Sequence, residues 1–150
     1  MPFTKIKHSR GEVELAWRDD GLRQNIEHRL TSSESPRPEF LTALQDFKRY
    51  VLHLCELPGG YDAEMTISSV SISSNDTQGR GIVVTALKKL PDVNSPLVLN
   101  TPHLTETASY DGGPELPSFA CAMLDRLEEE AAKFRSGERA QQELFAEKAA

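Results

Sequence analysis

Long apolar stretches are missing from this sequence. Hydrophobic residues make up 38% of its 150 residues, and no run approaches the roughly 20 apolar residues that a membrane-spanning helix needs. The basic residues of segment 1–17 are not followed by a continuous apolar run, as they would be in a secretory signal. We therefore expect a cytoplasmic protein without a membrane partner.

Cysteine is scarce, and the spacing of metal ligands is absent. Cys55 and Cys121 are the only cysteines, and each lies in an apolar stripe of helical spacing. This favours reduced, buried thiols in the cytoplasm, while a disulfide between the two stays open. The four histidines lie at positions 8, 28, 53 and 103. Neither among themselves nor with the two cysteines do they have the spacing of zinc ligands.

Motifs that identify enzymes are missing as well. The sequence has no P-loop, no dinucleotide fingerprint and no G-x-S-x-G motif. His53 and Cys55 do not form a nucleophile pair, because helix residues two positions apart point to different sides. Segment 79–81, Gly-Arg-Gly, is too short to hold a phosphate and indicates a turn before a strand. We expect a protein that is not an enzyme, with no catalytic residue, no metal and no cofactor.

Segment 3–30 alternates between apolar and polar positions, as strands with one solvated face do. Val13, Leu15 and Trp17 share one face, and the residues after Gly21 continue the same period. Asp20-Gly21 between the two runs predicts a hairpin turn. These features indicate a three-stranded antiparallel meander.

Two segments have the apolar spacing of helices. One spans residues 40–55 after a proline-rich start, and the other spans residues 117–137. Gly137 is typical of a C-terminal helix cap. On the second helix, we interpret the acidic run 128–130 as the solvated face.

A second β region lies between the two helices. Segment 65–75 changes phase midway, which predicts a β-bulge near Ser68, and segment 79–90 predicts a more central strand. Segment 91–117 holds five of the nine prolines, so only residues 97–99 are strand-like, at a sheet edge or in a loop.

These elements predict an α+β fold. Their order is β-β-β-α-β-β-α, with room for an extra short edge strand. The economical arrangement is a two-layer sandwich, an antiparallel sheet with both helices on one face. We assign residues 1–136 to a single domain and residues 137–150 to a C-terminal tail that carries a linear motif.

The predicted tail keeps two large apolar residues side by side, Leu144 and Phe145, although chain ends are usually polar and mobile. With Gln141 they give the spacing Q-x-x-L-F, which resembles the peptide by which many bacterial replication and repair proteins bind the sliding clamp. The resemblance implies that Gln141 makes polar contacts at the mouth of a cleft and that Leu144 and Phe145 fill an apolar pocket. Gln142 and Glu143 depart from the pattern, which favours leucine or methionine and then serine or aspartate.

Two other uses of the tail stay open. If the last helix runs through Gly137, Leu144 and Phe145 extend its apolar stripe and pack on the core. One glycine costs such a helix only about 1 kcal/mol. Alternatively, the last helix and the tail pack on a second copy. The protein is then a homo-oligomer, a self-associating interaction module whose proline-rich segment binds another protein.

Four segments resemble a group of small proteins encoded by temperate phages and prophages: RPEFLTALQ, LHLCELP, NSPLVLNTPHL and RAQQELF. The resemblance brings no known activity, and it implies a bacterial cytoplasm and a link to phage DNA metabolism. Together with the clamp motif, it predicts a non-enzymatic phage or prophage accessory protein that is recruited to the host's DNA replication machinery.

Direct binding of nucleic acid is a weaker alternative. The formal net charge of −6 disfavours contacts to a phosphate backbone, which need clustered lysine and arginine. A single-stranded nucleic acid would contact Lys5, Lys7, Arg23 and Arg29 on the solvated strand faces. Aromatic residues, however, are too sparse and scattered to stack its bases.

Overall fold

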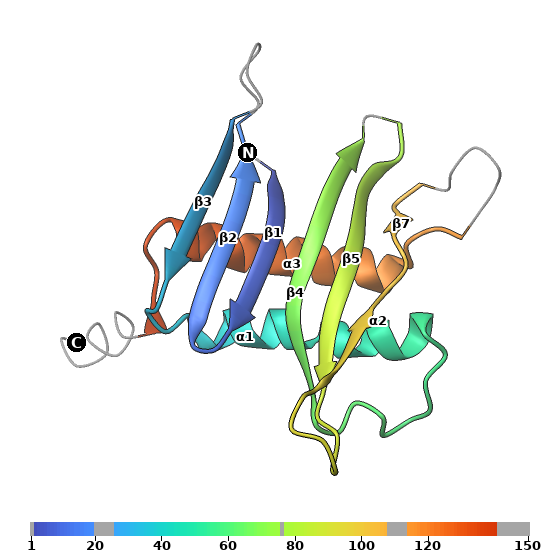
Figure 1. The fold of residues 1–150 in the computed structure, drawn as a ribbon. Coiled ribbons are helices and arrows are strands. Elements are labelled where there is room, and N and C mark those ends of the chain that lie inside the picture. The colour runs from blue at the N-terminus through green and yellow to red at the C-terminus, as the bar shows by residue number, and fades with distance from the viewer. Residues whose placement is uncertain (1, 20–25, 76, 108–113, 141–150) are drawn as a thin grey trace.

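The computed structural model describes residues 2–19, 26–75, 77–107 and 114–140, so the predicted turn at Asp20-Gly21 lies outside the described residues. In chain order, the strands and helices are β1 (Phe3–Ser9), β2 (Glu12–Arg18), β3 (Glu27–Ser32), α1 (Pro38–Gln45), α2 (Phe47–Leu54), β4 (Met65–Asn75), β5 (Gly79–Lys88), β6 (Leu97–Asn100), β7 (Leu104–Thr105) and α3 (Ser118–Arg135). Figure 1 shows one sheet whose helices all lie on the same face, which leaves the other face open. The predicted two-layer α+β architecture is confirmed.

The sheet is antiparallel and has seven strands. Its order is β3-β2-β1-β4-β5-β6, and β7 pairs with β5 nearer the start of that strand, at Gly81 and Ile82. As predicted for the segment around Leu97, β6 lies at an edge. The two halves of the sheet meet at β1 and β4, where the paired residues run only from Lys5 with Ser71 to Lys7 with Ser69. This junction is short.

Alternation decides which strand residues face the helices. Ile6 of β1 and Val13 and Leu15 of β2 are fully buried, while the side chains between them lie on the open face. The predicted bulge is confirmed, since the register between β4 and β5 shifts between Ile67 and Ser69. The sequence period therefore sets the two faces of the sheet.

The first predicted helix is two consecutive helices. α1 begins at Pro38, where the missing N–H of proline costs no helical hydrogen bond, and Asp46 separates it from α2. Phe40 of α1, with Phe47 and Val51 of α2, is fully or almost fully buried. The core lies between one face of the sheet and the three described helices.

One interpretation of α3 is wrong. The acidic run 128–130 is not uniformly solvated, because Glu130 is only 5% exposed. Its carboxylate lies 3.3 Å from the guanidinium of Arg37, which precedes α1. A buried carboxylate needs such a partner. Glu128 is also engaged, by Arg80.

Candidate functional site

The clamp-binding residues predicted from the sequence, Gln141, Leu144 and Phe145, lie outside the described residues. The structure does describe the segment that leads to them. α3 ends at Arg135, and Gly137 has a φ of 105°, a left-handed conformation that glycine adopts readily and a helix interior does not allow. The alternative in which one helix runs through Gly137 is therefore wrong.

The chain after α3 is held against the domain. Arg139 is 8% exposed, and its guanidinium lies 3.4 Å from the centroid of the Phe134 ring and 3.2 Å from the Glu34 carboxylate. The Ala140 backbone N–H donates to the Ser35 carbonyl at 3.2 Å. These contacts continue beyond the boundary at 136 suggested by the sequence, up to the residue before the predicted motif.

The cations of the nucleic-acid alternative lie on the open face, apart from Arg23, which is outside the described residues. Glu14 stands between two of them: its carboxylate is 4.0 Å from the Lys5 ammonium and 3.3 Å from the Arg29 guanidinium. Lys7 has no carboxylate partner in the described part of the chain. The structure thus brings Lys5 and Arg29 together around an acid. Phosphate binding favours an uncompensated basic strip instead.

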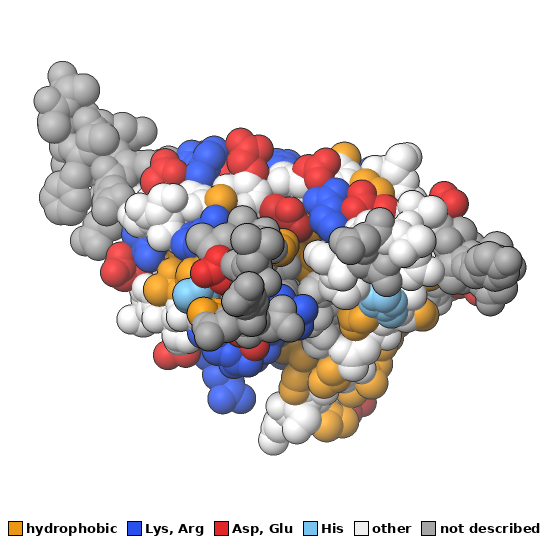
Figure 2. All heavy atoms as spheres, turned by 90° about the horizontal axis from the view of Figure 1, so that it is seen from above, with side chains coloured by type: hydrophobic (Ala, Val, Ile, Leu, Met, Phe, Trp, Pro, Cys, Tyr) orange, Lys and Arg blue, Asp and Glu red, His pale blue; other side chains and the backbone are white. Residues whose placement is uncertain are grey.

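The open face is mixed in chemistry along its width. In Figure 2, which looks from above along the strands, the open face is the lower border. There basic side chains project on the β1–β3 side and hydrophobic side chains on the β4–β6 side. Val98 of β6 pairs with Leu87 on this face and is 53% exposed. Such a surface suits contacts of mixed charge and apolar character better than a continuous path for a polyanion.

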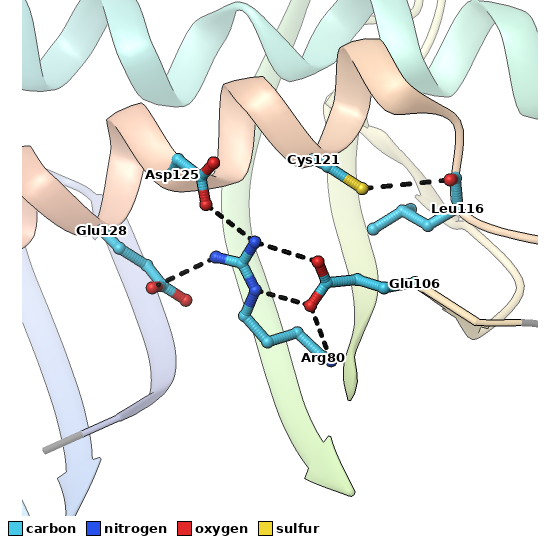
Figure 3. A network of polar contacts seen from close by, with 6 residues as sticks. All are labelled: Arg80, Glu106, Leu116, Cys121, Asp125 and Glu128. Atoms are coloured by element: carbon cyan, nitrogen blue, oxygen red, sulfur yellow. Dashed lines mark hydrogen bonds and ion pairs between the residues drawn. The ribbon is translucent and has the colours of Figure 1, made fainter. Parts of the chain in front are cut away.

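Sequence reasoning missed a polar network at the start of β5. Figure 3 shows three carboxylates turned toward the Arg80 guanidinium. Arg80 donates to Glu106 from Nε at 2.8 Å and from Nη2 at 3.2 Å. Asp125 and Glu128 of α3 lie 2.7 Å and 3.4 Å from the same guanidinium. Segment 79–81 is therefore part of the strand, not a turn before it, and its arginine connects elements that are far apart in the sequence.

The network joins β5, the segment after β7 and α3. Hydrogen bonds from Arg80 hold the pKa of the Glu106 carboxyl below its ordinary value, whereas burial raises the pKa of Glu128. Within the described residues, no group of three histidine, cysteine or acidic side chains is placed to hold a metal ion. The arrangement is that of a structural connection between elements.

The two cysteines and the Ser73–His103 pair are the described side chains closest in character to a nucleophilic site. Cys55 and Cys121 are free and half-buried, and burial raises the pKa of both thiols, which keeps them protonated and weakly nucleophilic. Ser73 Oγ lies 2.8 Å from His103 Nε2. In the described residues, however, no carboxylate pairs with His103 to orient it, as a nucleophile and base need.

Two further findings concern a membrane and similarity to known proteins. None of the helices in the described ranges combines the length and the apolar character that would let it cross a membrane. Comparison with protein-family models, with curated proteins and with solved structures finds no match.

Proposed function

We propose that this chain is a non-enzymatic accessory protein of phage or prophage DNA metabolism, recruited to the bacterial sliding clamp through Gln141, Leu144 and Phe145. The observation that carries the proposal is the place of the Q-x-x-L-F spacing. It begins directly after Ala140, whose backbone is hydrogen-bonded to the domain. The resemblance of four segments to phage and prophage proteins supplies the setting, a bacterial cytoplasm.

The position at which α3 ends supports clamp binding by the motif over packing of its apolar residues on the core of the domain. Because α3 ends before Gly137, its apolar stripe does not extend to the motif. Phe134, the last buried residue of that stripe, packs against Phe40 with ring centroids 5.8 Å apart and is covered by Arg139. We therefore assign the apolar pair of the motif to a groove on a partner.

Burial of two adjacent apolar side chains accounts for how a short peptide binds. Full burial of a leucine or a phenylalanine contributes about 1.5–3 kcal/mol, and the polar contacts of Gln141 fix the orientation of the peptide. The entropy lost on ordering the peptide and on association offsets much of this gain. We expect a dissociation constant of about 1–100 μM for a single motif.

Calorimetric titration of the full chain against a purified bacterial sliding clamp tests the proposal. The parent chain should bind. Leu144→Ala/Phe145→Ala should weaken binding by about 30-fold or more, because it removes most of the apolar area that the peptide buries. Gln141→Ala should weaken binding less, by about 3–10-fold, since it removes only polar contacts.

Gln142→Ala is the matched control, because position 142 departs from the clamp pattern and makes no contact in the proposal. This variant should bind as the parent does. Circular dichroism of each variant establishes that the domain is folded. If the parent does not bind, or if Leu144→Ala/Phe145→Ala binds equally well, the chain is not recruited through this motif.

A further inference from the structure

The open face has a cleft where the two halves of the sheet separate. Pairing between β1 and β4 covers only three residues of each strand, and beyond it both strands continue apart. Two adjoining cavities of about 440 Å³ and 490 Å³ lie here, and both are lined by Ser9, Arg10, Ser68 and Leu87. We refer to them together as the β1–β4 cleft.

Local backbone geometry opens this cleft. On one side, the residues of β4 before Ser69 pair with β5 alone among the described strands, and the bulge at Ser68 bends β4. On the other side, Arg10 has a φ of 53° in the turn between β1 and β2, and the residues of β1 after Lys7 pair with β2 alone among the described strands. The facing strand edges thus carry backbone groups that an extended peptide would pair with.

Cross-strand pairing sets the charges on the hairpin wall of the cleft. Lys7 faces Glu14 and Ser9 faces Glu12, so all four side chains lie on the same side of the sheet and line the cleft. Arg10 follows at the turn and lines both cavities. This wall is therefore charged along its whole length.

The charges of the hairpin wall do not cancel. Glu14 is already engaged by Lys5 and Arg29. Neither Lys7 nor Arg10 has an ion-pair partner in the described part of the chain. Two uncompensated cations therefore face the cleft, and they suit carboxylates of a ligand.

The opposite wall adds little net charge and some apolar surface. Lys89 and Glu64 pair with each other at 3.9 Å, while Leu87 and Pro96 offer apolar contact. Glu12 is the one further acid that lines the cleft without a described partner. The lining itself holds three cations and three acids. Lys5 and Arg29 beside Glu14 add two more cations, and this gives the region of the cleft an excess of positive charge in a chain whose formal net charge is −6.

We propose that the β1–β4 cleft binds an extended acidic peptide segment of another protein. The peptide backbone pairs with the strand edges at Ser9 and Ser68, and carboxylates at every second position bind Lys7 and Arg10. Successive side chains of an extended peptide point to opposite sides, so these carboxylates share one side. An apolar side chain of the peptide packs on Leu87. This binding is independent of the clamp motif.

A single-stranded nucleic acid also carries negative charge, but the cleft suits it less well. No phenylalanine, tyrosine or tryptophan is among the described residues that line either cavity, and bases bind single-strand proteins largely through stacking. The strand edges, in contrast, match the hydrogen-bonding groups of a peptide backbone. An oligonucleotide is therefore the competing outcome of the test.

Selection from a displayed library of random peptides, about eight residues long to match a strand, tests the inference on the full chain. Enriched peptides should carry aspartate or glutamate at alternate positions. They should bind the parent about tenfold or more tightly than Lys7→Gln/Arg10→Gln, because that variant loses two charge-assisted contacts. Amide NMR spectra should show the bound peptide shifting the signals of Ser9 and Ser68.

Arg18→Gln is the matched control, since it lies on the same open face at the other end of β2 and should bind as the parent does. Absence of enriched acidic peptides, equal binding by Lys7→Gln/Arg10→Gln, or amide shifts confined to β6 each overturn the inference. Binding of an oligothymidine of about 12 nucleotides in place of peptides, lost in the same variant, also overturns it. Peptide binding that persists in Leu144→Ala/Phe145→Ala separates this site from clamp recruitment.

Discussion

Gly81 on the open face of β5 leaves the space that the His103 ring fills. A Cβ atom at this position would lie 2.4 Å from His103 Nε2 and 2.7 Å from Ser73 Oγ, closer than real Cβ contacts come. The missing side chain lets His103 lie over the strand and reach Ser73 Oγ at 2.8 Å. The observed position of the His103 ring therefore depends on glycine at position 81.

Gly81→Ala should destabilise the folded protein by about 1 kcal/mol, because the added methyl group displaces the exposed His103 ring and breaks its hydrogen bond with Ser73. Urea denaturation measures the change in the free energy of unfolding. Gly59→Ala is the matched control: a Cβ there meets nothing within 4 Å, so its effect should stay below about 0.5 kcal/mol. Equal effects of the two substitutions would contradict the close contact with His103.

Position 81 also shows where sequence reasoning stops for single residues. Alternation predicts the strand and the face that each of its residues takes. The neighbour that a glycine makes room for, however, depends on how a distant loop folds back over the sheet. In the sequence His103 is one of four scattered histidines, and nothing local marks it as the partner of Ser73.

Arg80 connects β5 with α3 and with the segment after β7, in a network partly exposed to water and therefore partly screened. The pKa of Glu106 lies below 4.5, because hydrogen bonds from Arg80 stabilise its charged form. Its contribution to stability is therefore present above pH 4.5 and is lost as the pH falls through the pKa of the folded state. Glu128 acts in the opposite sense: burial raises its pKa above 4.5, so its charged form costs stability as the pH rises through that higher pKa.

Arg80→Gln should lower the free energy of unfolding by about 1–3 kcal/mol near pH 7, because three carboxylates lose their cation. The difference from the parent should shrink below pH 4.5, where the carboxylates become protonated. Denaturation at about pH 7 and about pH 3 measures both effects. Arg80→Lys keeps the charge but loses the two-point contact with Glu106, so it should lose less stability with the same trend. If Arg80→Gln lowers the free energy of unfolding equally at both pH values, the loss comes from packing and not from the ion pairs.

The helices and strands follow closely from the sequence, and the departures have a common cause. Strand alternation and the glycine at position 137 predict elements that the structure confirms. The break at Asp46 escapes prediction because the apolar stripe continues across it, so the helical period shows no interruption. Glu130 escapes prediction because its partner, Arg37, is distant in the sequence. The local sequence pattern predicts the type of an element, but it does not predict which distant residues contact that element.

At the scale of the whole molecule, the two proposed binding regions belong to different segments of the chain. Helices cover one face of the sheet (Figure 1). The residues that line the β1–β4 cleft lie on the other face. The segment that leads to the clamp motif is held at Ser35, in the connection between β3 and α1. If both proposals hold, the clamp and the acidic peptide bind to different segments of the chain, and the protein can link the two.

Truncation separates the anchored segment after α3 from the proposed motif. A chain that ends at Ala140 should melt within about 1 °C of the parent, because it keeps Arg139 over Phe134 and the backbone hydrogen bond to Ser35. A chain that ends at Ser136 loses both contacts, which lowers the free energy of unfolding by about 1–2 kcal/mol. Its melting temperature should fall by about 2–4 °C for each kcal/mol lost.

Light scattering of the same chains decides between recruitment and self-association. If residues 141–150 serve the clamp, the parent and the chain that ends at Ala140 have the same oligomeric state, and only the parent binds the clamp. If Leu144 and Phe145 pack on a second copy, removing them converts a dimer to a monomer, because an interface that loses its apolar anchors loses most of its binding energy. A dimer lost in this way would contradict recruitment even where the melting temperature stays unchanged, since the domain retains every contact up to Ala140.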